Sequence, residues 1–209
     1  MQIIVVSGMD GAGKTTLIQN LMKYFAPLRT EHVHLPYSTF VNSALTVSGQ
    51  GTPLGDPWTD RLIFALDNRL TAYQIRSLEA AGSTDVLIMQ RGWMDSYIYG
   101  ATQGIDYDTI TNLVRPADLP KATCGVYLNC DPRIAYERIK HDKKADKFET
   151  LLFMQAQYQE TKRFYKALEH DATLSKIFDE PRFYLDTTYF SIDDVILSAV
   201  NFLKANAIL

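Results

Sequence analysis

Short apolar runs alternate with longer amphipathic stretches along this chain. The runs predict buried strands at about 2–7, 32–35, 86–89, 126–129 and 183–185. Helical spacing of apolar positions predicts helices over about 14–26, 58–81, 131–139, 148–169 and 191–206. The segment 36–57, rich in glycine and proline, predicts a short helix followed by a loop. Such alternation is typical of parallel βαβ units, so we predict an α/β fold with a five-stranded parallel sheet, in one domain spanning 1–209.

The composition is that of an ordinary globular protein. Apolar residues make up 46% and charged residues 22% of the 209 residues, which argues against intrinsic disorder. The net charge is −3, which favours neither nucleic acid nor an anionic membrane surface as a partner. No apolar run approaches the ~18 residues needed to span a membrane, and the N-terminus has no signal-peptide pattern. The two cysteines, Cys124 and Cys130, indicate neither a zinc site nor a disulfide scaffold, so we expect a cytoplasmic protein.

The strongest motif is GMDGAGKT at residues 8–15, which matches the phosphate-binding pattern G-x-x-x-x-G-K-[ST] at every fixed position. It follows an apolar strand and precedes a helical pattern, and its glycines let backbone N–H groups point at phosphate oxygens. Lys14 is expected to contact the β- and γ-phosphates of a nucleoside triphosphate, and the Thr15 hydroxyl is expected to bind Mg²⁺. The residues expected to hold the triphosphate are Gly8, Met9, Asp10, Gly11, Ala12, Gly13, Lys14, Thr15 and Thr16.

The rest of the chain narrows the class of P-loop protein. The guanine motif N-K-x-D is absent, and 209 residues leave no room for a second motor domain. A small nucleotide or nucleoside kinase fits this size best.

Several stretches resemble the thymidylate kinase family. The loop GMDGAGKTT is similar to the family signature, in which an acidic residue follows the second loop position. Five further stretches match in order: LIFALDNRL (62–70), QRGWMDSYIYG (90–100), YLNCDPRIAYERI (127–139), DKFE (146–149) and YLDTTYFSIDDV (184–195). The resemblance covers almost the whole chain. It implies ATP- and Mg²⁺-dependent phosphoryl transfer to a deoxynucleoside monophosphate, dTMP above all.

The resemblance also implies an acceptor site. Asp10 would contact the acceptor sugar, and a carboxylate inside an anion-binding loop favours such a function over a structural role. Arg91 follows a buried strand at the ligand-binding edge of the sheet, and its planar fork suits capture of the acceptor phosphate. The other implied contacts are Phe64 and Arg69 for the base, with Ser96 and Tyr99 nearby. The residues alone also allow structural roles, namely core packing for Phe64, a surface ion pair for Arg91 and a solvated position for Arg69.

The charged segment 138–149 is the candidate lid over the transferring phosphates. Positive charge there would stabilise the charge that spreads over the γ-phosphoryl group. The resemblance places a catalytic basic residue in this lid, and the candidates are Lys143, Lys144 and Lys147. A solvated helix end is the alternative interpretation of such a charge run.

The chain departs from the family pattern at several positions. Gln90 stands where the family has an aspartate that helps organise Mg²⁺, and Gly92 replaces an aromatic residue. The run 35–45 lacks the arginine expected in the acceptor-phosphate loop, and lysines replace the lid arginines. We hypothesise that Asp95, one helical turn from Arg91, replaces the missing carboxylate.

These departures keep two alternative functions open. One is a deoxynucleoside kinase, which would need a carboxylate base near a nucleoside hydroxyl. The other is a nucleotide-binding regulator without kinase activity, which Gln90 and the missing loop arginine support. The resemblance further implies a homodimer packed through helices, for which the helix over 58–81 could offer a second apolar face.

Overall fold

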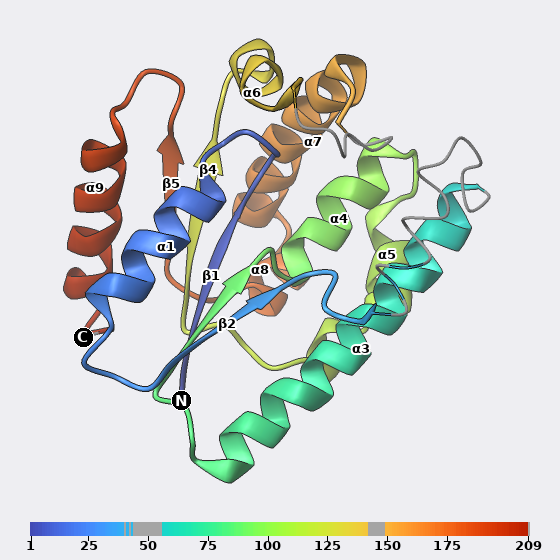
Figure 1. Cartoon of the computed structure of the whole chain (residues 1–209). Coiled ribbons are helices and arrows are strands. Elements are labelled where there is room, and N and C mark those ends of the chain that lie inside the picture. The colour runs from blue at the N-terminus through green and yellow to red at the C-terminus, as the bar shows by residue number, and fades with distance from the viewer. Residues whose placement is uncertain (40, 42, 44–55, 142–148, 209) are drawn as a thin grey trace.

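A computed structural model describes residues 1–39, 41, 43, 56–141 and 149–208. Within them, five strands form one parallel sheet in the order β2-β3-β1-β4-β5 (Figure 1). The strands are β1 (Gln2–Gly8), β2 (Thr30–His34), β3 (Val86–Gln90), β4 (Cys124–Asn129) and β5 (Arg182–Asp186). The predicted α/β architecture and its five parallel strands are confirmed. β2 begins two residues earlier than predicted, because its edge residues are polar and mostly exposed.

Helices connect and cover these strands. They are α1 (Lys14–Tyr24), α3 (Pro57–Ala81), α4 (Trp93–Thr102), α5 (Tyr107–Val114), α6 (Pro132–Ile139), α7 (Leu151–His170), α8 (Ala172–Ile177) and α9 (Ile192–Ala205), with a 3-10 turn, η1 (Pro116–Asp118). The five helices predicted from apolar spacing are confirmed to within three residues at every end. The helices α4, α5 and α8 were not predicted, and the six residues of α8 carry too little periodicity to be recognised. No helix in the described part of the chain is long and apolar enough to cross a membrane.

The sheet lies between two layers of helices. Along β1, Ile4 and Val6 face the core shared with α1 and α9, whereas Ile3 and Val5 face the core shared with α3, α4 and α7. Figure 1 shows α1 and α9 together on one side of the sheet and the larger helical layer on the other. Burying each large aliphatic side chain contributes roughly 1.5–3 kcal/mol to the free energy of unfolding. The two-sided burial of β1 thus fixes the strand that leads into the phosphate-binding loop.

Helix ends are set by the residues that the sequence supplies there. Ser191 accepts a hydrogen bond from the Asp194 N–H at 3.2 Å and is the N-cap of α9. Asp56 caps α3 in the same way, and Gly82 ends that helix in the left-handed conformation. Asp171 is the C-cap of α7 and the N-cap of α8. This single residue therefore separates two helices that the periodicity of apolar positions does not separate.

The strand order places the candidate site. β1 lies between β3 and β4, so the loop after β1 and the residue after β3 meet at the carboxyl edge of the sheet. Ligands bind at such positions in open parallel sheets, where the strand order changes direction. The candidate residues of 8–16 and Arg91 are brought together by this topology.

Candidate active site

The phosphate-binding loop is shaped by glycines whose positions exclude a side chain. A β-carbon on Gly8 would lie 2.1 Å from the Leu128 carbonyl oxygen, and one on Gly11 would lie 2.3 Å from that of Ala135. Gly13 adopts a left-handed conformation with a φ of 94° and precedes α1, which has no side-chain N-cap. The first N–H groups of α1 are therefore left for an anion, as phosphate binding at a helix N-terminus requires.

Lys14 is folded into the curve of this loop. Only 4% of it is exposed. Its ammonium group donates to the carbonyl oxygens of Gly8 and Met9, at 2.8 and 2.9 Å, and to Asp10 Oδ1 at 3.1 Å. Burial lowers the pKa of Lys14, and the Asp10 carboxylate opposes this effect. The lysine is thus held where the loop would surround the phosphates.

Arg91 is joined to the loop through Asp10. It follows β3 directly, with a left-handed φ of 71°, and its N–H donates to the Val6 carbonyl at 2.9 Å. Its Nη2 donates to both carboxylate oxygens of Asp10, at 2.7 and 3.0 Å, while its Nη1 donates to the Tyr99 hydroxyl. Burial alone would raise the pKa of Asp10, but Arg91 and Lys14 hold it well below its usual range. A continuous charged cluster therefore connects the triphosphate loop with the segment expected to hold the acceptor.

The other expected acceptor-site residues lie in two places. Tyr99 is buried beside Arg91, and burial raises its pKa. Ser96 is also buried and accepts a hydrogen bond from Asn68 Nδ2 at 3.0 Å, which joins α4 to α3. Arg69 points elsewhere, because its Nη2 donates to the Val114 carbonyl at 2.9 Å at the end of α5. The structure therefore places Tyr99 in the charged cluster and directs Arg69 away from Ser96.

Arg61 of α3 is a site candidate that the sequence analysis missed. It is 3% exposed, yet its Nε and Nη2 have no hydrogen-bond partner among the described residues. Its guanidinium lies over the Phe64 ring at 4.7 Å, and burial lowers its pKa to about 10. A β-carbon on Gly100 of α4 would lie 3.4 Å from Arg61 Cδ and only 2.6 Å from Ile110 Cδ1, so this glycine lets α4 pack closely against both residues. The sequence signal that could have identified Arg61 is a charged residue on the side of α3 that is otherwise buried.

Part of the candidate lid segment anchors the phosphate-binding loop. Arg138 Nη1 donates to the Gly11 carbonyl at 3.0 Å, and its Nη2 donates to the Thr187 carbonyl at 3.2 Å. The Thr187 hydroxyl in turn donates to the Ala12 carbonyl at 3.0 Å. The lid candidates Lys143, Lys144 and Lys147 lie outside the described residues, so their roles stay predictions.

The positions that depart from the family pattern have well-defined surroundings. Gln90 is buried at the end of β3, where its side chain hydrogen-bonds His32. Asp95 is 8% exposed and accepts hydrogen bonds of 2.7 Å from the Ser7 hydroxyl and the Gly92 N–H. Its carboxylate therefore fixes the start of α4 directly after Arg91.

Replacing Asp95 with asparagine should lower the free energy of unfolding by about 1–3 kcal/mol, since the amide oxygen alone must serve both donors. Denaturant unfolding measures this loss. If Asp95 also replaces the missing carboxylate, the Mg²⁺ dependence of turnover shifts as well. Asp108→Asn, at the exposed start of α5, is the matched control. Unchanged Mg²⁺ dependence and turnover in Asp95→Asn would contradict the carboxylate hypothesis.

The described residues fit a magnesium ion held mainly by phosphate oxygens. No group of three or more His, Cys, Asp or Glu side chains among them is arranged to hold a metal. Thr15 is exposed in the first turn of α1, so its hydroxyl is accessible beside the uncapped N–H groups. One hydroxyl together with phosphate oxygens and water suits Mg²⁺, which is seldom enclosed by protein ligands alone.

Comparison with known proteins identifies the family of this chain. Residues 6–179 match the family model described as thymidylate kinase. A probable thymidylate kinase of Pyrobaculum aerophilum is 27% identical over 155 residues, covering 74% of this chain and 78% of the relative. Probable thymidylate kinase 1 of Saccharolobus solfataricus is 24% identical over 84% of this chain and 90% of its own length. The thymidylate kinase of Blochmanniella pennsylvanica is 29% identical over 71% of this chain and 74% of its own. The chain therefore belongs to the thymidylate kinase family of nucleoside monophosphate kinases.

Proposed function

We propose that this protein transfers the γ-phosphoryl group of ATP to deoxythymidine monophosphate (dTMP), with Mg²⁺ as cofactor. The observation that carries this proposal is the Asp10–Arg91 pair, which joins the triphosphate loop to the expected acceptor-phosphate residue. The three relatives are known as thymidylate kinases or probable thymidylate kinases, which supports dTMP as the acceptor. Family membership favours a monophosphate acceptor over the nucleoside alternative.

The chemistry requires positioning and charge neutralisation more than covalent participation by the protein. An oxygen of the acceptor phosphate attacks the γ-phosphorus as the bond to the β–γ bridging oxygen breaks, and ADP leaves. Lys14 and the first N–H groups of α1 hold the triphosphate, while the Arg91 fork holds the acceptor phosphate. Mg²⁺, held by Thr15, would neutralise charge on the phosphates when bound. Asp10 fixes Arg91 and faces the acceptor sugar.

Two further elements complete the proposed site. The segment 138–149 closes as a lid that excludes water, with Lys143, Lys144 or Lys147 supplying positive charge. The unpartnered nitrogens of Arg61 suit a carbonyl oxygen of the acceptor base, because a guanidinium can only donate. We place the reaction in the reducing cytoplasm, which fits two buried free thiols, Cys124 and Cys130.

The test is ADP production from ATP and Mg²⁺ with a panel of deoxynucleoside monophosphates and the matching nucleosides. We expect strong turnover with dTMP and little with thymidine. Turnover with nucleosides alone would move the protein to the deoxynucleoside kinases. Tight ATP binding without acceptor-dependent ADP production would overturn the proposal and favour a nucleotide-binding regulator.

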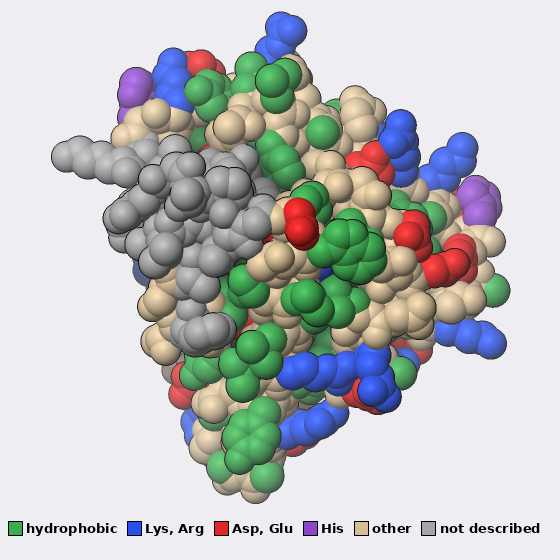
Figure 2. Space-filling view, turned by 90° about the vertical axis from the view of Figure 1, so that its right-hand side faces the viewer, with side chains coloured by type: hydrophobic (Ala, Val, Ile, Leu, Met, Phe, Trp, Pro, Cys, Tyr) green, Lys and Arg blue, Asp and Glu red, His purple; other side chains and the backbone are tan. Residues whose placement is uncertain are grey.

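We also propose that the protein forms a homodimer through α3. Five large apolar side chains on this helix are 42–73% exposed: Trp58, Leu62, Leu66, Leu70 and Tyr73. Their spacing of three and four residues puts them on one face of the helix. Figure 2 looks onto this side of the molecule, where apolar side chains gather in a line along the surface. A contiguous apolar stripe of this kind marks an interaction surface, and a second copy presents the same stripe.

Replacing Leu66 with glutamate at the centre of this stripe should convert the dimer into a monomer. A charge buried at the centre of an apolar interface has no partner, whereas in the monomer the glutamate is solvated. Sedimentation or light scattering at several protein concentrations measures the mass. Leu197→Glu on α9, where the leucine is 60% exposed on the other side of the sheet, is the matched control. A Leu66→Glu protein that keeps the mass of a dimer would show that the interface lies elsewhere.

A further inference from the structure

A cavity lies beneath the start of α4, on the side of the sheet away from the phosphate-binding loop. Its volume is about 340 Å³, within the lower range of known small-molecule sites, roughly 300–1,000 Å³. Its floor includes Val5 of β1 and Tyr127 of β4, and it opens beside the segments that precede β4 and β5. None of the residues proposed above to hold ATP or the acceptor lines it.

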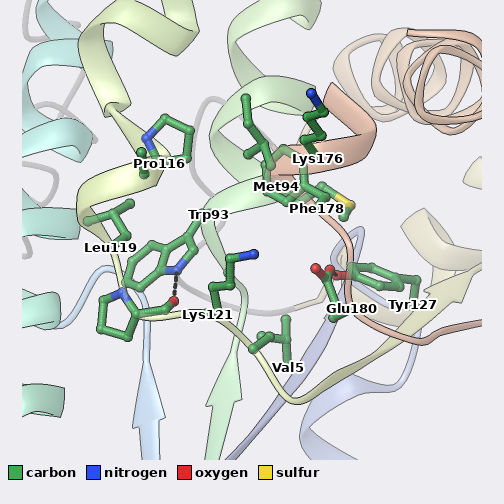
Figure 3. A pocket seen from close by; sticks show the side chains of 15 residues that line it. Val5, Trp93, Met94, Pro116, Leu119, Lys121, Tyr127, Lys176, Phe178 and Glu180 are labelled. Carbon is green, nitrogen blue, oxygen red and sulfur yellow. Dashed lines mark hydrogen bonds between the residues drawn. The ribbon is translucent and has the colours of Figure 1, made fainter. Parts of the chain in front are cut away.

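The walls of this cavity are mainly apolar. Figure 3 shows Trp93 and Leu119 on one side and Met94, Phe178 and Tyr127 on the other. The Trp93 indole N–H donates to the Pro120 carbonyl at 2.8 Å, which fixes the ring as a flat wall. Two facing rigid walls with aromatic rings favour a planar, largely apolar occupant.

Two opposite charges face one another across the opening. In Figure 3 the ammonium group of Lys121 and the carboxylate of Glu180 point toward each other from opposite sides. Lys121 is paired with Asp179 at 2.8 Å, and Glu180 accepts a hydrogen bond from the Tyr127 hydroxyl at 3.1 Å. Burial raises the pKa of Glu180, because water solvates this carboxylate less than an exposed one. An additional donor at this carboxylate would therefore be stabilising.

The charges around the cavity select a neutral occupant. Asp179 neutralises Lys121, and the positive charge of Arg182 acts on Glu180. An ionised carboxylate can only accept hydrogen bonds, and an ammonium group can only donate them. A molecule between Glu180 and Lys121 must then present an N–H on the edge toward Glu180 and a carbonyl oxygen on the opposite edge, toward Lys121. A keto-pyrimidine ring has this arrangement in one plane, in a body small enough for the cavity.

We propose that this cavity is a binding site for a neutral keto-pyrimidine base, separate from the acceptor site. The cavity lies next to the charged cluster of Lys14, Asp10 and Arg91. Gly92 lines the cavity and is joined to Arg91 by a peptide bond. A β-carbon at residue 92 would lie 2.9 Å from Val5 Cγ1, so glycine keeps this wall free of a side chain. An occupant here contacts the backbone that positions Arg91. The binding itself does not rest on the proposed kinase activity.

The two tryptophans of the chain allow a direct test with the ¹⁵N-labelled full-length protein. Trp93 forms a wall of the cavity, whereas Trp58 lies in the exposed stripe of α3 and serves as an internal reference. Titration with uracil should shift the Trp93 indole N–H signal and leave that of Trp58 unmoved. The compound 1,3-dimethyluracil has the same ring without N–H donors, and it should produce no shift at the same concentrations.

Variants separate this cavity from the acceptor site. Glu180→Gln should weaken uracil binding about tenfold, because a charged acceptor is lost. Glu169→Gln, an exposed change on α7, is the matched control and should bind as the unaltered chain does. Ala122→Phe fills the cavity and should abolish the Trp93 shift. Saturating dTMP should leave the shift in place.

Three results would overturn the proposal. A Trp93 signal that does not move with uracil shows that the cavity does not bind the base. Equal shifts with uracil and 1,3-dimethyluracil show that the Glu180 carboxylate accepts no hydrogen bond from the bound ring. Displacement of uracil by dTMP, with binding unaffected in Glu180→Gln, places the base in the acceptor site instead. Each result is independent of turnover, so a failure of the proposed kinase activity is seen separately in the ADP assay.

Discussion

Replacing Lys14 with alanine should abolish measurable phosphoryl transfer, a fall of roughly 10³-fold or more in kcat/KM. The lysine is 4% exposed and is the positive side chain inside the curve of the loop. Its loss removes the charge that would meet the β- and γ-phosphates, and it also frees the carbonyls of Gly8 and Met9 from their shared donor. ADP production at saturating dTMP, together with ATP binding by calorimetry, measures both consequences.

The design of this experiment separates chemistry from folding. Lys23→Ala removes an exposed lysine from the last turn of the same helix and should leave activity unchanged. Lys14→Arg keeps the charge but forces a wider planar group into a nearly closed space, so it too should be inactive. Circular dichroism shows whether each variant keeps its helices. Substantial turnover in a folded Lys14→Ala protein would remove the loop from the proposed mechanism.

The sequence was sufficient to predict the sheet and most helices because their signals are local. Continuous apolar runs such as 86–89 have no solvent-facing side, and in the structure every residue of β3 is buried. The short helix α8 gave no comparable signal, because Asp171 alone separates it from α7. The glycines at 8, 11 and 13 likewise allowed the phosphate-binding loop to be predicted from local sequence, since each adopts a positive φ there.

The acceptor side was harder to predict, because neighbouring helix positions differ by about 100° in direction. Asn68 and Arg69 are adjacent in sequence, yet Asn68 contacts Ser96 while Arg69 contacts the end of α5. Only the packing of α3 against α4 decides which of the two faces the site. Arg61 was missed for the same reason.

Contacts between residues that are distant in sequence set a second limit on what the sequence can predict. Arg138 lies in a charged segment that indicates a lid, yet its guanidinium binds the Gly11 carbonyl, 127 residues away. No local pattern predicts such a contact. It means that the base of the proposed lid and the phosphate-binding loop form one structural unit, so closure of the lid would be transmitted to the loop at Gly11.

Replacing Arg91 with alanine should chiefly impair use of the acceptor. We expect kcat/KM for dTMP to fall roughly 10²–10³-fold, with ATP affinity changing far less, because the fork that would hold the acceptor phosphate is gone. Arg91→Lys keeps a charge without the fork and should recover only part of the loss. Arg29→Ala removes an exposed arginine from an ion pair with Asp85 and is the matched control. Equal losses of ATP and dTMP affinity would contradict a specific acceptor role.

The same variant should also alter stability in a way that depends on pH. Arg91 and Lys14 hold the pKa of Asp10 well below its usual range, so the pair stabilises the folded state above about pH 4. That contribution is lost as the pH falls through the lower pKa of the folded state. Arg91→Ala leaves a mostly buried carboxylate with one cation and should cost about 2–3 kcal/mol at pH 7. The difference from the unaltered protein should shrink below pH 4.

A double variant tests whether the stability and the activity have the same origin. Adding Asp10→Asn to Arg91→Ala removes the unpaired carboxylate, so it should restore part of the free energy of unfolding. It should not restore turnover, because neither the fork toward the acceptor phosphate nor the carboxylate toward the sugar is present. Unfolding at pH 7 and below pH 4, measured beside ADP production, gives both quantities for the four proteins of the cycle. If stability and turnover recovered together, Arg91 would be a structural partner of Asp10 rather than the residue that holds the acceptor.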